Sequence, residues 1–358
     1  MPHSQPSSAA TLPPASCPFR LLVQTAAQFA FGHGTGGPEC LVNLAIALAA
    51  NLPHGCTSIF TGNELHGALR PDYPDFGALQ QRGVEGHEEA LLRRGDMLIL
   101  PEIDECPAHL VNRGVRVWIY QLGTSPACHR LRQGCRFFVH NSWLSNQFGV
   151  NVTRQMVVRP PMNPTHIAER HKYALPPERR VNRVLINGHD LPAHALEAIQ
   201  TACRRVAQSG RATDVSCEVP HGHSKPKLRT LMGESKVVIA WCMRGTERLP
   251  IEAAVYGAVM LTNDCAVGSD PRDFPLPEHH RLPTAEALAE TMASLLSSES
   301  AHRLAFQQQQ PLRELYLGIG PRSMAKEAAA FLRVAAQPQP AEELGNCESR
   351  GGDRDKKM

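Results

Sequence analysis

Short hydrophobic runs alternate along the chain with longer stretches in which apolar residues recur at helical spacing. Before residue 160, the runs of strand length are residues 21–24, 58–60, 97–100, 115–120, 136–139 and 155–158. A helix is predicted after the first run, because apolar residues follow Pro38 at helical spacing as far as Leu48. This alternation is typical of a mostly parallel sheet covered by helices.

A second alternation begins after residue 180. Its predicted strands are residues 184–186, 215–217, 237–241 and 259–262, and its predicted helices are residues 193–208, 226–232, 250–256, 284–296, 301–317 and 322–335. Between the two alternations, residues 160–180 contain five prolines and many charges, a composition that predicts an interdomain connection.

The pattern therefore predicts an α/β fold with two Rossmann-like, doubly wound domains that face a central cleft. Ligands of open α/β folds bind outside the carboxyl ends of the strands, so we expect the functional site in that cleft. The expected parts are a disordered leader (1–17), an N-terminal domain (18–160), a linker (161–180), a C-terminal domain (181–320), a C-terminal helix (321–335) and a disordered tail (336–358).

Composition excludes several classes of protein. With 358 residues, 42% of them hydrophobic, the chain can bury two cores of ordinary domain size. The formal net charge is only +3 and the basic residues are scattered, so we expect no nucleic-acid partner. The longest clean apolar run, residues 237–243, has the length of a strand, far below the roughly 18 to 20 residues of a membrane span. We expect a soluble protein.

The cysteines and the amino terminus bear on the compartment. Eleven cysteines lie between Cys17 and Cys347, with no CxxC pair and no short-chain disulfide spacing, which predicts a reducing compartment and a cytoplasmic protein. Residues 1–16 are rich in Ser, Pro and Ala and lack the apolar core of a secretory signal. An organelle-targeting peptide is the alternative, although such peptides are rich in Arg and residues 1–17 contain none.

The most informative stretch is residues 234–264. A buried-looking strand, residues 237–241, runs into a loop, and a helix is predicted to begin at Leu249 or Pro250 and to end at Gly257. The amino terminus of this helix would point into the cleft. Its free N–H groups and the positive end of its dipole form an anion site.

The side chains of this loop suit a nucleotide diphosphate. Gly245 and Thr246 precede the helix, with the Thr246 hydroxyl near the cap position, and Arg248 adds a fixed cation that can contact a diphosphate through two N–H groups. Glu252 lies in the first turn, where a carboxylate can accept both vicinal hydroxyls of a ribose. The set predicts a site for a UDP or GDP leaving group.

Residues 245–258, GTERLPIEAAVYGA, resemble the nucleotide-sugar signature of GT-B glycosyltransferases, particularly the glycogen-synthase-like retaining group. That signature reads roughly E-G-F-G-L-x-x-x-E-A-x-x-x-G. Glu252 matches its second acid, which the resemblance assigns to the ribose, and Gly257 matches its last glycine. The position of the first acid, eight residues before Glu252, holds Arg244, and Glu247 lies three residues after it. Glu247 and Arg248 are the catalytic candidates. Residues 247–254 follow an acid-Arg-x-Pro-x-Glu-Ala-Ala pattern similar to that of divergent bacterial and algal glycosyltransferase-like sequences.

The resemblance extends more weakly over most of the chain. Gly36 and Gly37 end a loop similar to the Gly-Gly loop that in this family approaches the donor diphosphate from the opposite domain. Glu102, at the end of residues 96–102, and His140, in residues 139–142, resemble strand ends on the acceptor side and the hinge. Residues 187–190 lack the family's usual Arg, for which Lys225 or Lys227 is the candidate substitute.

Each feature also has a simpler interpretation. Residues 34–37 are equally a tight turn, and residues 102–105, with Glu102, are equally a solvated acidic loop. Arg248 and Glu252, four residues apart, would form a surface ion pair worth a few tenths of a kcal/mol. His140 is one of 17 histidines, most of which we expect to be structural.

Two histidine pairs are candidate metal ligands: His221 with His223, and His279 with His280. No flanking Cys or acid completes a ligand set, so we expect no metal site.

These observations lead to three hypotheses. The first is a glycosyltransferase that moves a sugar from a nucleotide-diphosphate donor to an unknown acceptor and needs no cofactor, because cationic side chains and the helix dipole neutralise the diphosphate. Arg244 at the first-acid position motivates the second, a catalytically inactive GT-B module that binds nucleotide or glycan. The third is a nucleotide-sugar epimerase, for which no acid and base around a sugar ring can be identified.

Overall fold

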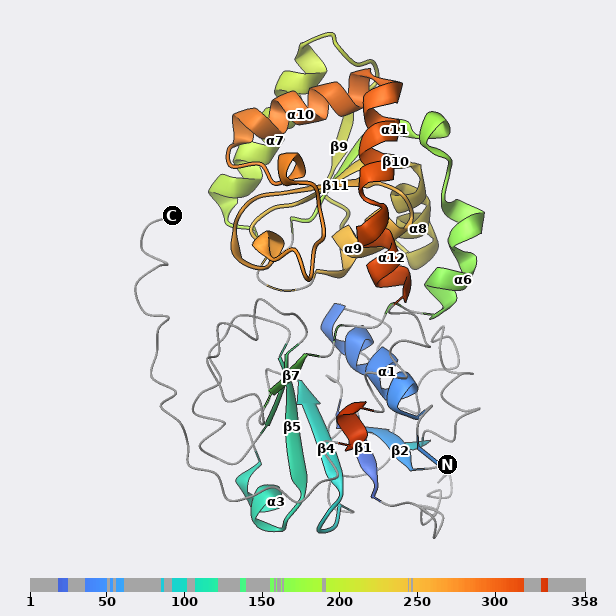
Figure 1. Ribbon diagram of the computed structural model, residues 1–358, viewed down its shortest axis with the longest axis vertical. Helices are drawn as coiled ribbons and strands as arrows, with labels where there is room; N and C mark the ends of the chain where they lie inside the picture. The colour runs from blue at the N-terminus through green and yellow to red at the C-terminus, as the bar shows by residue number, and fades with distance from the viewer. Residues whose placement is uncertain are drawn as a thin grey trace, which may run out of the picture. The chain divides into compact units, whose positions relative to one another are not determined.

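The computed structural model describes residues 19–24, 36–49, 52–53, 56–60, 85–86, 92–101, 107–121, 136–139, 155–157, 159, 162, 164–188, 191–243, 245, 247–318 and 330–333. They belong to two compact α/β units. Figure 1 shows the helices and strands coloured by residue number. The first unit holds the described residues among 1–120, 127–137 and 325–342. The second holds those among 121–126, 138–324 and 343–358.

Among the described residues, the first sheet has seven strands, in the order β3-β2-β1-β4-β5-β6-β7. The strands are β1 (Leu21–Gln24), β2 (Thr57–Phe60), β3 (Glu85–Gly86), β4 (Met97–Pro101), β5 (Arg116–Gln121), β6 (Arg136–Val139) and β7 (Gln155–Val157). β1 pairs in parallel with β2 and β4, and β4 pairs in parallel with β5. The predicted strands are confirmed to within one residue at each end; β3, which has two residues, was not predicted.

The first unit buries the apolar residues that the pattern singled out. Every residue of β4 is buried, as expected of a parallel strand with both faces covered. Helix α1 (Gly36–Ala49) packs against β1 and β2, with Leu41, Leu44 and Leu48 in the core. A short helix, α3 (Ala108–Asn112), precedes β5. Residues 330–333, part of the predicted last helix, are helical, and Phe331 meets Trp118 of β5 edge to face, with the ring centroids 4.9 Å apart.

The second sheet has four strands in the order β11-β10-β8-β9, and all its pairings are parallel. The strands are β8 (Val181–Ile186), β9 (Ser216–Glu218), β10 (Ser235–Ala240) and β11 (Val259–Thr262). The helices of this unit are α6 (Pro164–Tyr173), α7 (Ala193–Gln208), α8 (Lys225–Glu234), α9 (Arg248–Val255), α10 (Ala285–Ser297), α11 (Glu299–Gln308) and α12 (Gln310–Gly318).

The strand order places the helices on both faces of this sheet. α7 connects β8 to β9 in one direction across the sheet, whereas α8 and α9 connect strands in the other direction, so right-handed crossovers put α7 opposite α8 and α9. α10 lies beside α7 (Figure 1). The core of β8, β10, β11, α7 and α10 is aliphatic, with Ile239, Leu261 and Leu288 fully buried.

The predicted single helix over residues 301–317 is wrong, because the chain forms α11 and α12 with a break at Gln309. The Gln309 side chain is buried and bonds to β11: its Oε1 accepts from Met260 N at 2.8 Å, and its Nε2 donates to Met260 O at 2.7 Å. Pro311, the second residue of α12, has no N–H to continue the α11 ladder.

Residues 160–180, predicted as a connection, contain a helix. α6 begins at Pro164, where a missing N–H costs nothing. Glu169 of α6 accepts a hydrogen bond of 2.6 Å from Arg229 Nη1 of α8. The buried Arg229 thus ties this segment to the second unit.

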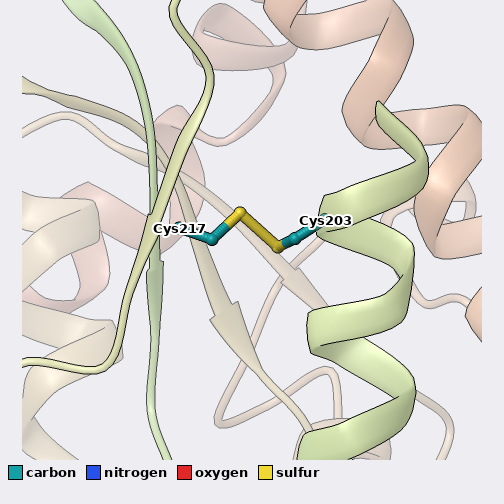
Figure 2. Close-up of a disulfide and its surroundings, with 2 residues drawn as sticks. All are labelled: Cys203 and Cys217. Atoms are coloured by element: carbon teal, nitrogen blue, oxygen red, sulfur yellow. A yellow bond between two sulfur atoms is a disulfide. The ribbon is translucent and has the colours of Figure 1, made fainter. Parts of the chain in front are cut away.

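Two of the cysteines that we expected to be separate thiols are joined. Cys203 of α7 and Cys217 of β9 form a disulfide with a Cα–Cα distance of 6.3 Å (Figure 2). Cys56 is also disulfide-bonded. The expectation of dispersed thiols is wrong, since the Cys203–Cys217 pairing depends on α7 lying over β9, and the cysteine pattern no longer argues for a reducing compartment.

Removal of the Cys203–Cys217 bond should destabilise the fold. The bond closes a loop with a sequence separation of 14, for which chain entropy predicts a loss of about 3 kcal/mol in the free energy of unfolding. Cys217 is exposed, so Cys217→Ser removes little packing. Urea unfolding of this variant checks the value. Ser216→Ala, at the exposed neighbour, is the control and should change it by less than about 0.5 kcal/mol; equal stability of Cys217→Ser and the parent would contradict the prediction.

Two histidines are held neutral inside the second unit. Burial lowers the pKa of His302 from 6.5 to about 4, and its Nε2 lies 3.1 Å from Lys236 O. Burial likewise lowers the pKa of His280 to about 4, and its Nδ1 accepts from Gln309 Nε2 at 2.8 Å.

The stability of the second unit should fall as the pH drops below 6.5. An unfolded imidazole takes up a proton near pH 6.5, whereas the folded ones do so near pH 4, so protons favour the unfolded chain. Between pH 7 and pH 5, each histidine should lower the free energy of unfolding by about 2 kcal/mol. Urea unfolding of the parent and of His302→Gln at both pH values checks this. The variant should lose about 2 kcal/mol less than the parent, and identical pH dependence of the two proteins would rule out His302 as the cause.

Candidate functional site

The candidate site lies at the carboxyl edge of the four-stranded sheet. β10 pairs with β8 and β11 in parallel, with Ile239 opposite Ile186 and Ala240 opposite Thr262, so the three strands end at one edge. Helices that follow these strands begin at the same edge and present their positive ends there. The first turns of α7, α8 and α9 therefore all lie on the side of the sheet where open α/β folds bind ligands.

The connection from β10 to α9 is fixed at its start. Cys242 has a φ of +45°, and its N–H donates to Asn263 Oδ1 at 2.8 Å. The next residue, Met243, is buried, and its carbonyl accepts from Val267 N at 3.4 Å. Gly268 belongs to the same contact, because a Cβ there would lie 2.5 Å from Thr262 Oγ1. Residues after β11 thus fix the position of Cys242 and Met243, which follow β10.

α9 begins at Arg248, one residue before the earliest predicted start. Gly245 is buried in the connection, and Glu247 directly precedes the helix without a side-chain cap hydrogen bond. Pro250, the third helical residue, has no N–H, so the backbone donors of the first turn include Arg248 and Leu249 but not Pro250. Thr246 and Arg244 lie outside the described residues.

Arg248 and Glu252 form an ion pair between Nη2 and Oε1. The interpretation of a weak surface pair is wrong, because the exposed fractions of the two side chains are only 15% and 6%. The pair therefore holds a guanidinium at the amino terminus of α9 and a carboxylate one turn into the helix.

A tyrosine and several charged groups lie near the carboxyl end of α9. Tyr256 is buried, and its pKa is raised to about 12, first by burial and further by the Glu252 and Glu169 carboxylates, against the Arg229 charge. The centroid of its ring lies 6.4 Å from that of the Tyr173 ring on α6. The carboxyl end of α9 therefore lies within the electrostatic influence of charged side chains on α6, α8 and α9.

Gly257 ends α9 as predicted, with a φ of +105°. A Cβ at this position would collide with the guanidinium of Arg180. Arg180 is buried and donates to Ser235 O at 2.8 Å and to Tyr256 O. Burial, and then the Arg313 charge, lower the pKa of Arg180 to about 10, so it stays protonated at neutral pH.

The remaining predicted residues are separate from α9 in the chain. Gly36 and Gly37 are the first two residues of α1, in the first unit. Lys225 and Lys227 lie in the first turn of α8. The acceptor-side candidates Glu102 and His140 lie outside the described residues. Asp96, at the start of the segment that ends with Glu102, lies before β4 and accepts from Arg20 N and Nε at 2.9 and 2.8 Å, an ion-pair contact at the amino end of the strand.

The histidine pairs take other partners. His223 Nε2 lies 2.8 Å from Glu218 Oε1, and His280 is buried against Gln309. In the described part of the chain, no three His, Cys, Asp or Glu residues gather closely enough to hold a metal ion. Within the same residues, no helix is both long and apolar enough to cross a bilayer.

Residues that the sequence analysis missed lie beside the start of the α9 connection. Asn263 and Cys265 follow β11, Cys242 follows β10, and His194 lies in the first turn of α7. Their position just after predicted strands was a usable signal, since parallel strand ends share an edge. Their contacts were not predictable, because they join segments about 20 residues or more apart.

Comparison with known proteins identifies the fold. No protein-family model matches the sequence, and no curated protein matches it either. Solved structures do match: a glycosyltransferase from Rickettsia africae ESF-5 has a TM-score of 0.60 at 11% identity, covering 90% of this chain and 99% of its own.

Two further structures agree. A trehalose-6-phosphate protein from E. coli bound with UDP-2-fluoro glucose has a TM-score of 0.54 at 14% identity, covering 90% of this chain and 100% of its own. The catalytic domain of starch synthase IV from Arabidopsis thaliana, bound to ADP and acarbose, has a TM-score of 0.52 at 10% identity, covering 89% and 100%. The chain has the α/β fold of GT-B glycosyltransferases.

Proposed function

We propose that the protein is a glycosyltransferase that moves a sugar from a nucleotide-diphosphate donor to an acceptor. The observation that carries the proposal is the buried Arg248–Glu252 ion pair in the first turns of α9, at the carboxyl edge of a parallel sheet. Structures of the same fold are bound to UDP-2-fluoro glucose or to ADP, which supports a nucleotide-sugar as the donor class.

In this proposal, the donor diphosphate binds at the start of α9. The N–H groups of Arg248 and Leu249 and the positive end of the helix face the phosphates. The Arg248 guanidinium moves from Glu252 to a phosphate oxygen, which exchanges one anionic partner for another and keeps the cation paired. As the bond to the sugar breaks, charge develops on the diphosphate and Arg248 stabilises it.

Glu252 then takes the ribose. Once Arg248 has turned to the diphosphate, the Glu252 carboxylate accepts the two vicinal hydroxyls in place of the guanidinium donor. Gly245 and Thr246 are the proposed diphosphate-lining residues of the β10–α9 connection, and Glu247 is the proposed catalytic acid. Gly36 and Gly37, the first two residues of α1, are the donor-binding candidates of the first unit. Glu102 and His140 are the proposed acceptor-side residues. No metal is needed, because the cationic side chain and the helix dipole balance the diphosphate charge.

The second candidate function is a module of the same fold that binds nucleotide without turnover. Arg244 occupies the position at which the glycogen-synthase-like signature has its first acid, and this substitution favours the second candidate. The two functions differ in one measurement. Donor hydrolysis or transfer above a heat-killed control excludes the inactive module, and nucleotide binding without turnover favours it.

Substitutions of the ion pair should separate ribose recognition from diphosphate recognition. In titration calorimetry with UDP, GDP, ADP and pyrophosphate, Glu252→Gln should weaken the preferred nucleotide about tenfold to a hundredfold, because a charged acceptor of two hydroxyls is lost. It should leave pyrophosphate binding unchanged or tighter, because the Glu252 carboxylate no longer competes with the phosphates for Arg248. Arg248→Gln should weaken nucleotide and pyrophosphate alike.

The control is Glu290→Gln on α10, which removes the exposed Arg211–Glu290 ion pair and should change neither affinity. Circular dichroism of each variant verifies that the fold is kept. An absence of binding to all three nucleotides by the parent protein would remove the proposal. So would a Glu252→Gln variant that loses pyrophosphate as strongly as nucleotide.

A further inference from the structure

Two free thiols and an amide meet where β10 and β11 end. Cys242 is the second residue after β10, Asn263 is the first after β11 and Cys265 is the third. Because β10 and β11 pair in parallel, these positions lie side by side. Cys242 and Cys265 are both half-buried, whereas Cys40 is buried.

Asn263 fixes the orientation of the Cys242 sulfur. Its Oδ1 accepts from Cys242 N at 2.8 Å, and its Nδ2 donates to Cys242 Sγ at 3.0 Å. The φ of +45° at Cys242 places the residue in the left-handed region, which is uncommon for a residue other than glycine. The Cys265 side chain is a second hydrogen-bonding partner of the same sulfur. The Cys242 sulfur therefore contacts two polar side chains.

This arrangement favours a thiolate on Cys242. The hydrogen bond from Cys265, then that from Asn263 and the charge of His194, lower the pKa of Cys242 to about 6, against burial, which raises it. The same contact and burial raise the pKa of Cys265, which keeps its proton. The contact therefore favours the thiolate form of Cys242 and the protonated form of Cys265, a combination typical of reactive protein cysteines.

We propose that Cys242 is a site of oxidative modification by hydroperoxides, with Cys265 as the second thiol that closes a disulfide. In the first step, the Cys242 thiolate attacks a peroxide oxygen: an S–O bond forms and the O–O bond breaks. The departing alkoxide, or hydroxide when the oxidant is hydrogen peroxide, takes a proton from solvent and leaves as the alcohol or water. The sulfur is oxidised by two electrons to the sulfenic acid. In the second step, the Cys265 sulfur attacks Cys242, the S–S bond forms, the S–O bond breaks and water leaves with the Cys265 proton.

The proposal is independent of the proposed function, since neither step involves a nucleotide or a sugar. The site belongs to the β10–α9 connection, so the disulfide links this connection covalently to the segment after β11. Noncovalent contacts already hold the two together through Asn263.

Peptide mapping of the full chain tests the chemistry. One equivalent of hydrogen peroxide at pH 7, followed by alkylation and mass spectrometry, should give a cross-linked Cys242–Cys265 peptide, with Cys40 still reduced. Cys265→Ser keeps a hydrogen-bond donor but no second sulfur, so dimedone should trap a sulfenic acid on Cys242. In Cys242→Ser, Cys265 should stay reduced. Oxidation of Cys265 in that variant, or unmodified Cys242 in the parent, overturns the proposal.

A second measurement tests the geometry. The rate of alkylation of native Cys242 by iodoacetamide should rise with a midpoint near pH 6. Asn263→Asp keeps the acceptor for Cys242 N but removes the donor to the sulfur and adds a negative charge, so alkylation at pH 7 should slow about tenfold. A parent midpoint near 8.5, the value of an unperturbed thiol, contradicts the proposal even if the variant fails to fold.

Discussion

Parallel pairing forces the chain to leave β8, β10 and β11 at the same edge of the second sheet, and the chemistry of this unit depends on that constraint. Segments that are distant in sequence, after Ile186, Ala240 and Thr262, become neighbours there. Each strand must then return through a helix or loop that starts at the same edge, so helix amino termini and loop side chains collect in one place. Both the α9 site and the Cys242 site are consequences of this geometry.

The opposite end of α9 is held as firmly as its beginning. The buried guanidinium of Arg180 bonds to Ser235 O, where β10 starts, and to Tyr256 O, where α9 ends. Gly257 leaves room for that guanidinium and supplies the positive φ that turns the chain into β11. With both ends of β10 and the end of α9 fixed, the direction of the α9 axis, and hence of its dipole, is determined by contacts within the unit.

Local features of this fold were predictable and tertiary contacts were not. The helix over residues 193–208 and the strand over 259–262 have the predicted bounds, because periodicity and burial agree within each segment. The break at Gln309 was missed, since it depends on hydrogen bonds from a side chain to a strand 49 residues away. For the same reason, the Cys203–Cys217 disulfide and the contacts of Cys242 with Asn263 were missed, whereas Arg248 and Glu252 were found because helical spacing alone brings them together.

The burial of the Arg248–Glu252 pair is the strongest physical argument that α9 does more than fill space. An apolar pair of similar volume would stabilise the helix as well or better, because two charges lose most of their hydration when buried. α9 already has a well-packed apolar face, with Ile251, Ala254 and Val255 buried. In the proposed function, Arg248 and Glu252 exchange each other for a diphosphate and a ribose. That exchange, at the positive end of α9, would explain two charges that helix packing does not require.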